Sequence, residues 1–268
     1  MADFQAQVEA LSGLTITSST SPTLTELSQF LKDGVVDVIN RCIIISPRER
    51  ESFSRESAEQ TSNGFNPGSN EIIAVLREDG TNNQWYPCRK ENIGLQYRVT
   101  DTSSLHYASK YSPVYMISQN RNIHVYPEPS ASGNDTFKVL YVNYDAEETD
   151  GTDLQYNSTG IKWFPDDKVY LVIIYASIKS LYNALSAHKN PTVVPNFGDA
   201  ENLINIEEDA EMLAGRIQTI NAQIADYQAK VQESVVDYGW MEQRAKSLIQ
   251  EYNSAFASMA GPQPKGNR

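Results

Sequence analysis

Apolar residues recur at three- and four-residue steps along Trp163–Ala187, the most hydrophobic stretch of the chain. This spacing predicts a helix. Pro165 suits the first helical position, and Asp166 and Asp167 place negative charge at the positive end of the helix dipole. Pro191 predicts where the helix ends. Because the first half is apolar nearly all round, we expect a core helix. The apolar run is shorter than the ~20 residues that a membrane span needs, so we predict no membrane helix.

Two further helices are predicted near the N-terminus. The first covers Ala2–Leu11, with its apolar residues on one side. The second begins after Thr23, which forms a capping box with Glu26, and continues to about Ile44. The charged stretch that follows, residues 48–60, is compatible with a helix whose charges face solvent.

The pattern changes at Asn63, where Gly and Pro residues begin to separate short segments rich in Ile, Val and Tyr. Such segments are typical of β-strands joined by turns, and a close antiparallel hairpin is expected around Gln119 and Asn120. We therefore predict an α+β fold in which an antiparallel β domain is inserted into a helical bundle. The expected strands are Glu71–Arg77, Gln84–Cys88, Tyr97–Thr100, Val114–Ser118, Asn122–Tyr126 and Thr136–Asn143.

A heptad pattern occupies the C-terminal region. Apolar or small residues alternate at four- and three-residue steps from Ile206 to Met259, and no proline interrupts them. One helix of this length would measure roughly 80 Å at ~1.5 Å per residue, too long for the preceding domain to cover. A helical hairpin broken at Gly215 or Gly239 is the alternative. We expect contacts with other copies or a partner through Leu213, Ile217, Ile220, Ile224, Tyr227, Val231, Tyr238, Met241, Leu248 and Tyr252.

These patterns divide the chain into five segments. They are the N-terminal helices (1–62), the β domain (63–157), the returning core helix (158–195), the heptad region (196–260) and a tail expected to be disordered (261–268). Because the capped helices and the β region have apolar residues for a core of their own, we expect the part before Pro195 to fold without the heptad region.

The net charge of −12 and the pI near 4.7 disfavour nonspecific attraction to nucleic acid or to an anionic membrane, which require clustered Lys and Arg. We interpret the two cysteines, Cys42 and Cys88, as buried small hydrophobic residues and not as a disulfide. The N-terminus has no basic segment followed by a long apolar run, so we expect synthesis in the cytoplasm without a secretory signal.

The sequence carries no motif for catalysis or for a cofactor. The three histidines, His106, His124 and His188, belong to separate segments and form no metal-ligand spacing. Asp166 and Asp167 are explained by the helix dipole. We therefore predict no catalytic residue, no cofactor and no metal site. The tyrosines of the β region favour sheet core or a protein interface over a platform for stacking nucleic-acid bases, because Lys and Arg are sparse around them.

Several phrases of the chain resemble the structural proteins of tailed bacteriophages, in particular the head-to-tail connector (adaptor or neck) proteins of marine and cyanobacterial phages. The resemblance covers about Ser21 to Ala187. It rests on PTLTELSQFLKDGVVDVINR, on QWYPC followed by QYRVTDTSSLHYASKYSPVYMI, on NIHVYPEPS and on GIKWFPDDKVYLVIIYASIKSLYNAL. These resemble the opening helix, the inserted β region and the returning Pro-Asp-Asp helix of the family, whose compact adaptors lack the long heptad region.

The resemblance implies a non-enzymatic protein of the virion neck that forms a ring, typically of twelve copies, beneath the portal. Tail or neck proteins would be its other neighbours, and genomic DNA would pass through the lumen as cargo without specific binding. The alternative is a tail or fibre-attachment protein that has a coiled-coil oligomerisation helix and a β binding domain. Fibres are commonly threefold whereas a connector follows the portal, so the symmetry of the assembly separates the two hypotheses.

Overall fold

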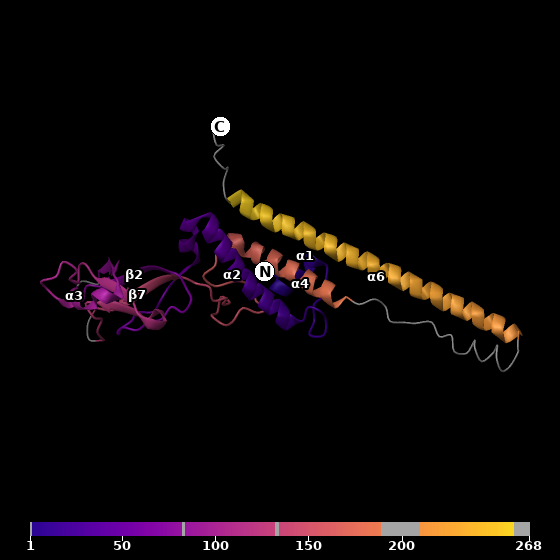
Figure 1. Ribbon diagram of the computed structural model, residues 1–268, viewed down its shortest axis with the longest axis horizontal. Helices are drawn as coiled ribbons and strands as arrows, with labels where there is room; N and C mark the ends of the chain where they lie inside the picture. The colour runs from indigo at the N-terminus through magenta and orange to yellow at the C-terminus, as the bar shows by residue number, and fades with distance from the viewer. Residues whose placement is uncertain (1, 82–83, 132–133, 189–209, 260–268) are drawn as a thin grey trace, which may run out of the picture. The chain divides into compact units, whose positions relative to one another are not determined.

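The computed structural model has the predicted α+β class (Figure 1). It describes residues 2–81, 84–131, 134–188 and 210–259, with the side chains of 210–216 left aside. The chain divides into two compact units, which cut across the five predicted segments. The first, the helical unit, comprises Met1–Leu31, Gln155–Asn157 and Ile173–Ala255; the second, the β unit, comprises Lys32–Leu154, Ser158–Val172 and Phe256–Arg268.

Both N-terminal helices form where they were predicted. In α1 (Phe4–Ser12), the side chain of Asp3 accepts a hydrogen bond from the backbone N–H of Ala6 at 2.8 Å and caps the first turn. The predicted capping box opens α2 (Leu24–Ile45), because Glu26 Oε2 accepts from the backbone N–H of Thr23 at 2.7 Å. These bonds satisfy N–H groups that the first turn of a helix leaves without partners.

The predicted core helix is a short 3-10 turn, Asp166–Lys168, followed by α4 (Val169–Ala187). Pro165 occupies the N-cap, one position before the predicted one. By length and composition alone Asp166–Ala187 could cross a membrane, but half of its apolar window is buried inside the chain, and Leu171 and Leu181 are fully buried. Packing against the rest of the chain therefore accounts for the hydrophobicity of α4. Pro191, the predicted end signal, lies outside the described residues.

The β unit contains two small sheets. The larger is antiparallel and has the order β1 (Ser54–Glu56), β7 (Phe137–Val142), β2 (Ile72–Glu78), β3 (Trp85–Pro87). The smaller has the order β4 (Arg89–Lys90), β5 (Val114–Ile117), β6 (Ile123–Tyr126). In it β5 and β6 form the predicted hairpin, whereas β4 pairs parallel to β5, so the prediction of a wholly antiparallel β domain was wrong at this edge.

The two sheets share one apolar core, which explains the alternation of their sequences. Strands β2, β5, β6 and β7 all contribute residues of one parity to it, and in β5 and β6 the residues of the other parity, Val114, Met116 and Tyr126, are buried in a second cluster. The fully or nearly buried members are Val75, Tyr115, Ile123, Val125, Phe137, Val139 and Tyr141.

Two predicted elements differ from the structure. The stretch Tyr97–Thr100 belongs to a short helix, α3 (Gln96–Thr100), and not to a strand. Val99 is buried and packs with Leu95, four residues earlier, which is the spacing of one helix face. The stretch 48–60, predicted to be compatible with a helix, lies in a 3-10 helix, Pro47–Phe53, followed by β1. Because the backbone of β1 forms hydrogen bonds with β7, a longer helix does not form there.

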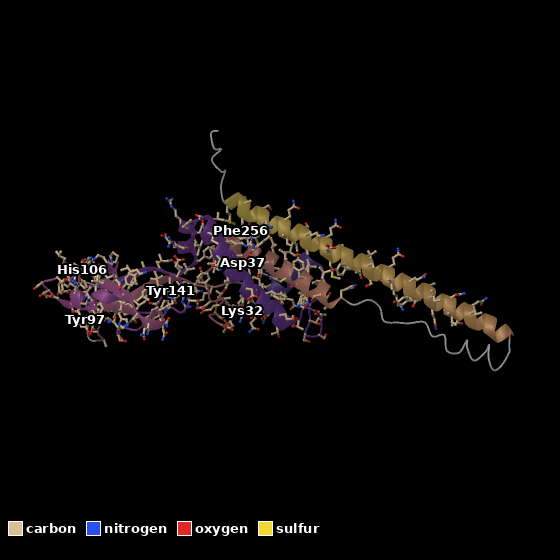
Figure 2. The ribbon with its side chains drawn as sticks, viewed as in Figure 1. Lys32, Asp37, Tyr97, His106, Tyr141 and Phe256 are labelled. Atoms are coloured by element: carbon tan, nitrogen blue, oxygen red, sulfur yellow. The ribbon has the colours of Figure 1, made fainter. Side chains whose placement is uncertain are left out.

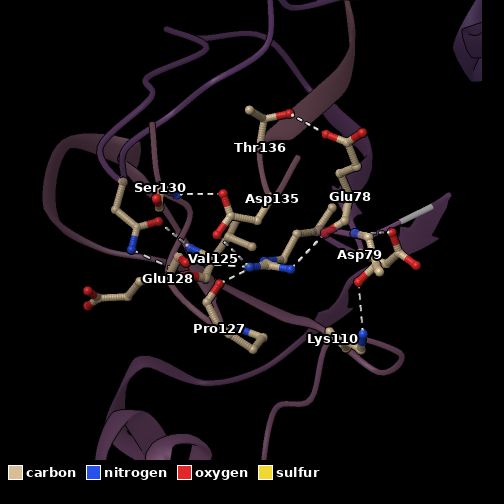
Figure 3. A network of polar contacts seen from close by, with 12 residues as sticks. Glu78, Asp79, Lys110, Val125, Pro127, Glu128, Ser130, Asp135 and Thr136 are labelled. Atoms are coloured by element: carbon tan, nitrogen blue, oxygen red, sulfur yellow. Dashed lines mark hydrogen bonds and ion pairs between the residues drawn. The ribbon is translucent and has the colours of Figure 1, made fainter. Parts of the chain in front are cut away.

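A buried arginine, Arg77, joins β2 to the segment that follows β6, and Figure 3 labels its partners Glu78, Pro127 and Asp135. The side chain of Arg77 is 4% exposed. Its Nε donates to the carbonyl of Pro127 at 2.8 Å and one terminal nitrogen donates to the carbonyl of Glu78 at 2.7 Å. The other lies 3.8 Å from the carboxylate of Asp135. Burial lowers the pKa of Arg77, and the charge of Asp135 opposes this shift, so the guanidinium stays charged and acts as a structural clamp.

Both cysteines are free thiols, as predicted. Burial raises the pKa of Cys42 to about 11 and that of Cys88 to about 12. Since the thiolate is the reactive form, both behave as small hydrophobic residues at neutral pH.

Candidate contact surface on helix α6

The heptad region forms one continuous helix, α6 (Ala210–Met259), drawn from orange to yellow in Figure 1. Neither Gly215 nor Gly239 breaks it, so the hairpin alternative was wrong. Pairs at i,i+4 spacing support the exposed face: Lys230 contacts Asp226 at 2.7 Å, and a second pair lies nearer the C-terminus. Ile206, where the predicted stripe begins, and the tail 261–268 lie outside the described residues.

The C-terminal half of α6 is part of the chain's own core. Ala245 and Leu248 are 1% and 0% exposed. Tyr252 is also buried, and its ring lies 6.1 Å from that of Tyr175 on α4. Leu248 and Tyr252, which we predicted as contacts between copies, are therefore covered within the chain and leave the candidate set. The expected boundary near Pro195 also needs correction, because removing the heptad region would open this core.

Two side chains of α6 fix it to the end of α1. Arg244 Nε donates to the carbonyl of Leu11 at 2.8 Å. The ring of Trp240 covers Gly13, where a Cβ atom would lie 2.5 Å from the ring. Gly13 also has φ of +72°, a conformation that favours glycine, so both the turn and the ring require glycine there.

The last turn of α6 belongs to the β unit and is anchored there. Phe256 is 5% exposed, and the guanidinium carbon of Arg41 lies 5.5 Å from its ring centroid. Arg41 is held by Asp37, one turn earlier on α2, at 2.8 Å (Figure 2 labels Asp37 and Phe256). A cation over an aromatic face is a stabilising contact.

The preceding half of α6 is different, because its heptad residues remain partly exposed. Ile217 and Tyr238, near the two ends of this half, are 47% and 45% exposed, and only Ile220 between them is buried. We call the partly exposed residues the α6 stripe: Ile217, Ile224, Tyr227, Val231, Tyr238 and Met241. The side chain of Leu213, also predicted as a contact, lies outside the described residues.

Sequence reasoning missed part of this apolar surface. Val235, Val236 and Trp240 are 62%, 63% and 49% exposed and lie outside the predicted heptad positions. At about 100° per residue, Val235 falls beside the stripe, whereas Val236 and Trp240 fall on the opposite side of α6. The only signal in the sequence was the residue types, because Val and Trp exposed on a helix commonly mark a surface that contacts an apolar partner.

One polar contact holds the end of α4 beside the α6 stripe. His188 Nε2 lies 2.7 Å from Ser234 Oγ and 3.2 Å from the Ser234 carbonyl. The imidazole also lies 6.0 Å from the ring of Tyr238. Serine and histidine at this distance resemble part of a catalytic triad, but among the residues that the structure describes no carboxylate forms an ion pair with this imidazole, and the contact is explained as a tie between two helices.

The other two histidines belong to the β unit. His106 lies 3.7 Å from Glu91 in the β unit, and His124 is on β6. Within the described ranges, no group of three or more His, Cys, Asp or Glu side chains is placed to hold a metal ion. Asp167 lies 3.5 Å from Lys168, whose amine also contacts Glu49 at 2.9 Å. Burial lowers the pKa of Lys168, but the hydrogen bond to Glu49 together with the charges of Glu49 and Asp167 outweighs it, so the pKa is raised.

No protein-family model and no curated protein matches this chain.

Proposed function

We propose that the chain is a non-enzymatic structural subunit of a tailed-phage particle, a connector that forms a ring between the portal and the tail. The observation that carries the proposal is the α6 stripe. A soluble helix rarely leaves a run of Ile, Val, Tyr and Met partly exposed along several turns, and burying it against other copies or a partner is the usual solution.

The order of elements supports the same assignment. The opening helix α2, the β region and the returning helix α4 follow one another in the order of the phage connector proteins that these phrases resemble. The capping box that opens α2, in PTLTE, lies within one of these phrases. The Pro-Asp-Asp turn that precedes α4 lies within another. The residues that carry the resemblance therefore occupy the ends of helices and the strands that build the fold.

The two halves of α6 suit an assembling subunit. The C-terminal half is fixed by Leu248, Tyr252 and Arg244, so the half with the stripe extends from a rigid base. Because the base is ordered before association, little conformational entropy is lost when the stripe is covered.

The acidic charge suits a passage for DNA. A chain with 34 Asp and Glu against 22 Lys and Arg repels the phosphate backbone, so DNA would pass as cargo without specific binding. Portal, tail and neck proteins are the proposed neighbours in the virion, and no membrane is involved.

Electron microscopy of the purified assembly tests the proposal. We expect closed rings of high rotational order, with twelve copies the expected number, and the same symmetry when the protein is bound to a portal. A threefold stalk would instead support the fibre-attachment alternative. A protein that stays a single copy and does not bind the portal would contradict the connector assignment.

A further inference from the structure

The outer edge of β6 is closed by a short segment that lies outside the named strands. Strand β6 is the last strand of the smaller sheet, and residues 63–65 run along its outer side. The backbone N–H of Gly64 donates to the carbonyl of Ile123 at 2.9 Å, and the N–H of Ile123 donates to the carbonyl of Phe65 at 2.8 Å. These two bonds pair the first outward-facing residue of β6.

The side chain of Asn63 pairs the next outward-facing residue of β6. Its Oδ1 accepts from the backbone N–H of Val125 at 2.6 Å, and its Nδ2 donates to the carbonyl of Val125 at 3.3 Å (Figure 3 labels Val125). The amide therefore makes the two bonds that the backbone of a further strand would make. Because an open strand edge is a template for pairing with other chains, this closure protects β6 from such pairing.

The structure requires both residues of the Asn63–Gly64 pair. An amide both donates and accepts at Val125, which a carboxylate cannot do. Gly64 has φ of +108°, a conformation that favours glycine. The next residue, Phe65, packs against the core of the β unit and holds the segment in place, with its ring 6.2 Å from that of Tyr141.

Asn-Gly is also among the asparagine pairs that deamidate fastest, and it occurs once in this chain, at Asn63–Gly64. In this reaction the backbone nitrogen of the glycine attacks Cγ of the asparagine. The new N–Cγ bond replaces the Cγ–Nδ2 bond, and the proton of the glycine N–H leaves with the amide nitrogen as ammonia. Water then opens the cyclic imide to aspartate or isoaspartate. Glycine favours the attack because it has no side chain to hinder the approach.

The fold restrains both reacting groups. The nitrogen of Gly64 becomes a nucleophile when it loses its proton, and in the fold that proton is donated to the carbonyl of Ile123. The amide of Asn63 is fixed at Val125 by two bonds, so Cγ cannot turn toward the Gly64 nitrogen without breaking them. Reaction in the folded protein therefore requires local opening of residues 63–65.

We infer that Asn63 is a deamidation site that the fold protects, and that the protected amide is the group that closes the edge of β6. A carboxylate at position 63 would still accept from the N–H of Val125, but it could not donate to the Val125 carbonyl and would repel it. A chain modified before it folds would therefore carry an open edge on the smaller sheet. The inference uses only the β unit and does not depend on the proposed ring.

Incubation of the full chain at pH 8.5, with and without guanidinium chloride, tests the protection. Peptide mass spectrometry follows the conversion of each asparagine to the acid. In the unfolded chain we expect Asn63 to be converted before any other asparagine. In the folded protein its conversion should be slower by about tenfold or more, because only molecules in which the segment is open react. Equal rates in the two samples, or faster conversion of another asparagine in the unfolded chain, would overturn the inference.

The variant Asn63→Asp tests the role of the amide at the edge of β6. Hydrogen exchange at the N–H groups of Ile123 and Val125 should be faster than in the unmodified chain by about tenfold or more, because the segment opens more often. The matched control is Asn92→Asp, which makes the same charge change at an exposed residue. Asn92 only accepts a bond, from the N–H of Gly94 at 2.9 Å, and a carboxylate keeps it. Unchanged exchange in Asn63→Asp would show that this side chain does not close the edge.

Discussion

At the scale of single residues, Arg77 shows how the β unit satisfies a buried charge. Three of its contacts reach carbonyl or carboxylate oxygens at Glu78, Pro127 and Asp135 (Figure 3). Removing a buried partner of this kind leaves the others without a donor, which costs more than the bond itself contributes.

We expect Arg77→Ala to lower the free energy of unfolding by about 3 kcal/mol, the usual cost of breaking a buried charged contact. Arg77→Lys should recover only part of this loss, since an ammonium group cannot donate in the fork geometry of guanidinium. Denaturant unfolding measures both. Arg98→Ala, at an exposed site, is the control and should change stability little. Equal stability of Arg77→Ala and the unmodified chain would show that the clamp contributes nothing.

The two thiols give a second prediction at this scale. With the pKa of Cys42 at about 11 and that of Cys88 at about 12, almost no thiolate exists at neutral pH. Iodoacetamide at pH 7.5 should therefore leave both residues unmodified in the folded protein and modify both in denaturant, as measured by intact mass. Rapid modification of either cysteine in the native state would contradict its burial.

At the scale of elements, α6 has a buried half and a partly exposed half in one helix. Leu248 belongs to the core, whereas Val235, on the same helix, is 62% exposed. A uniform heptad pattern does not distinguish these surroundings, because both a core and an interface between copies require apolar residues at the same spacing.

Leu248→Ala should destabilise the protein by about 3 kcal/mol, since it removes a fully buried side chain and leaves a cavity. Val235→Ala, the matched control on α6, should change stability by less than about 0.5 kcal/mol. Thermal unfolding compares the two. Similar effects from both substitutions would mean that the C-terminal half of α6 does not pack in the core.

The success of prediction differed between elements for physical reasons. The capping box at Thr23 and the hairpin after Ile117 are local, so a few neighbouring residues determine them. By contrast, Tyr97–Thr100 alternates like a strand, and only its packing through Leu95 and Val99 selects a helix. Strand β1 depends on β7, more than 80 residues away, and no local pattern in a charged stretch predicts that pairing.

The candidate site was predictable only in part, for a related reason. The heptad spacing located α6, but which of its residues stay exposed depends on where Arg244 and Trp240 attach the helix to α1. The exposure of Tyr97 and Leu105 was less visible still, because residues of these types are common in a core segment. Exposure comes from the tertiary arrangement, which a single sequence does not contain.

At the scale of the whole molecule, we propose a subunit whose core is complete within one chain and whose apolar helix face is covered when copies assemble. The central claim is that the α6 stripe carries this association. Ile224 and Val231 are partly exposed members of the stripe, so changing them alters the surface and leaves the core at Leu248 in place.

The most direct test is the light-scattering mass of the full chain and of the double variant Ile224→Asp with Val231→Asp. We predict a ring for the full chain and, at micromolar concentration, a 30.0 kDa single copy for the variant, because association would bury unpaired carboxylates. The matched control, Ala222→Asp with Ala229→Asp on the opposite face of α6, should assemble like the full chain. A double variant that folds and assembles as the full chain does would contradict the claim that the stripe holds the copies together.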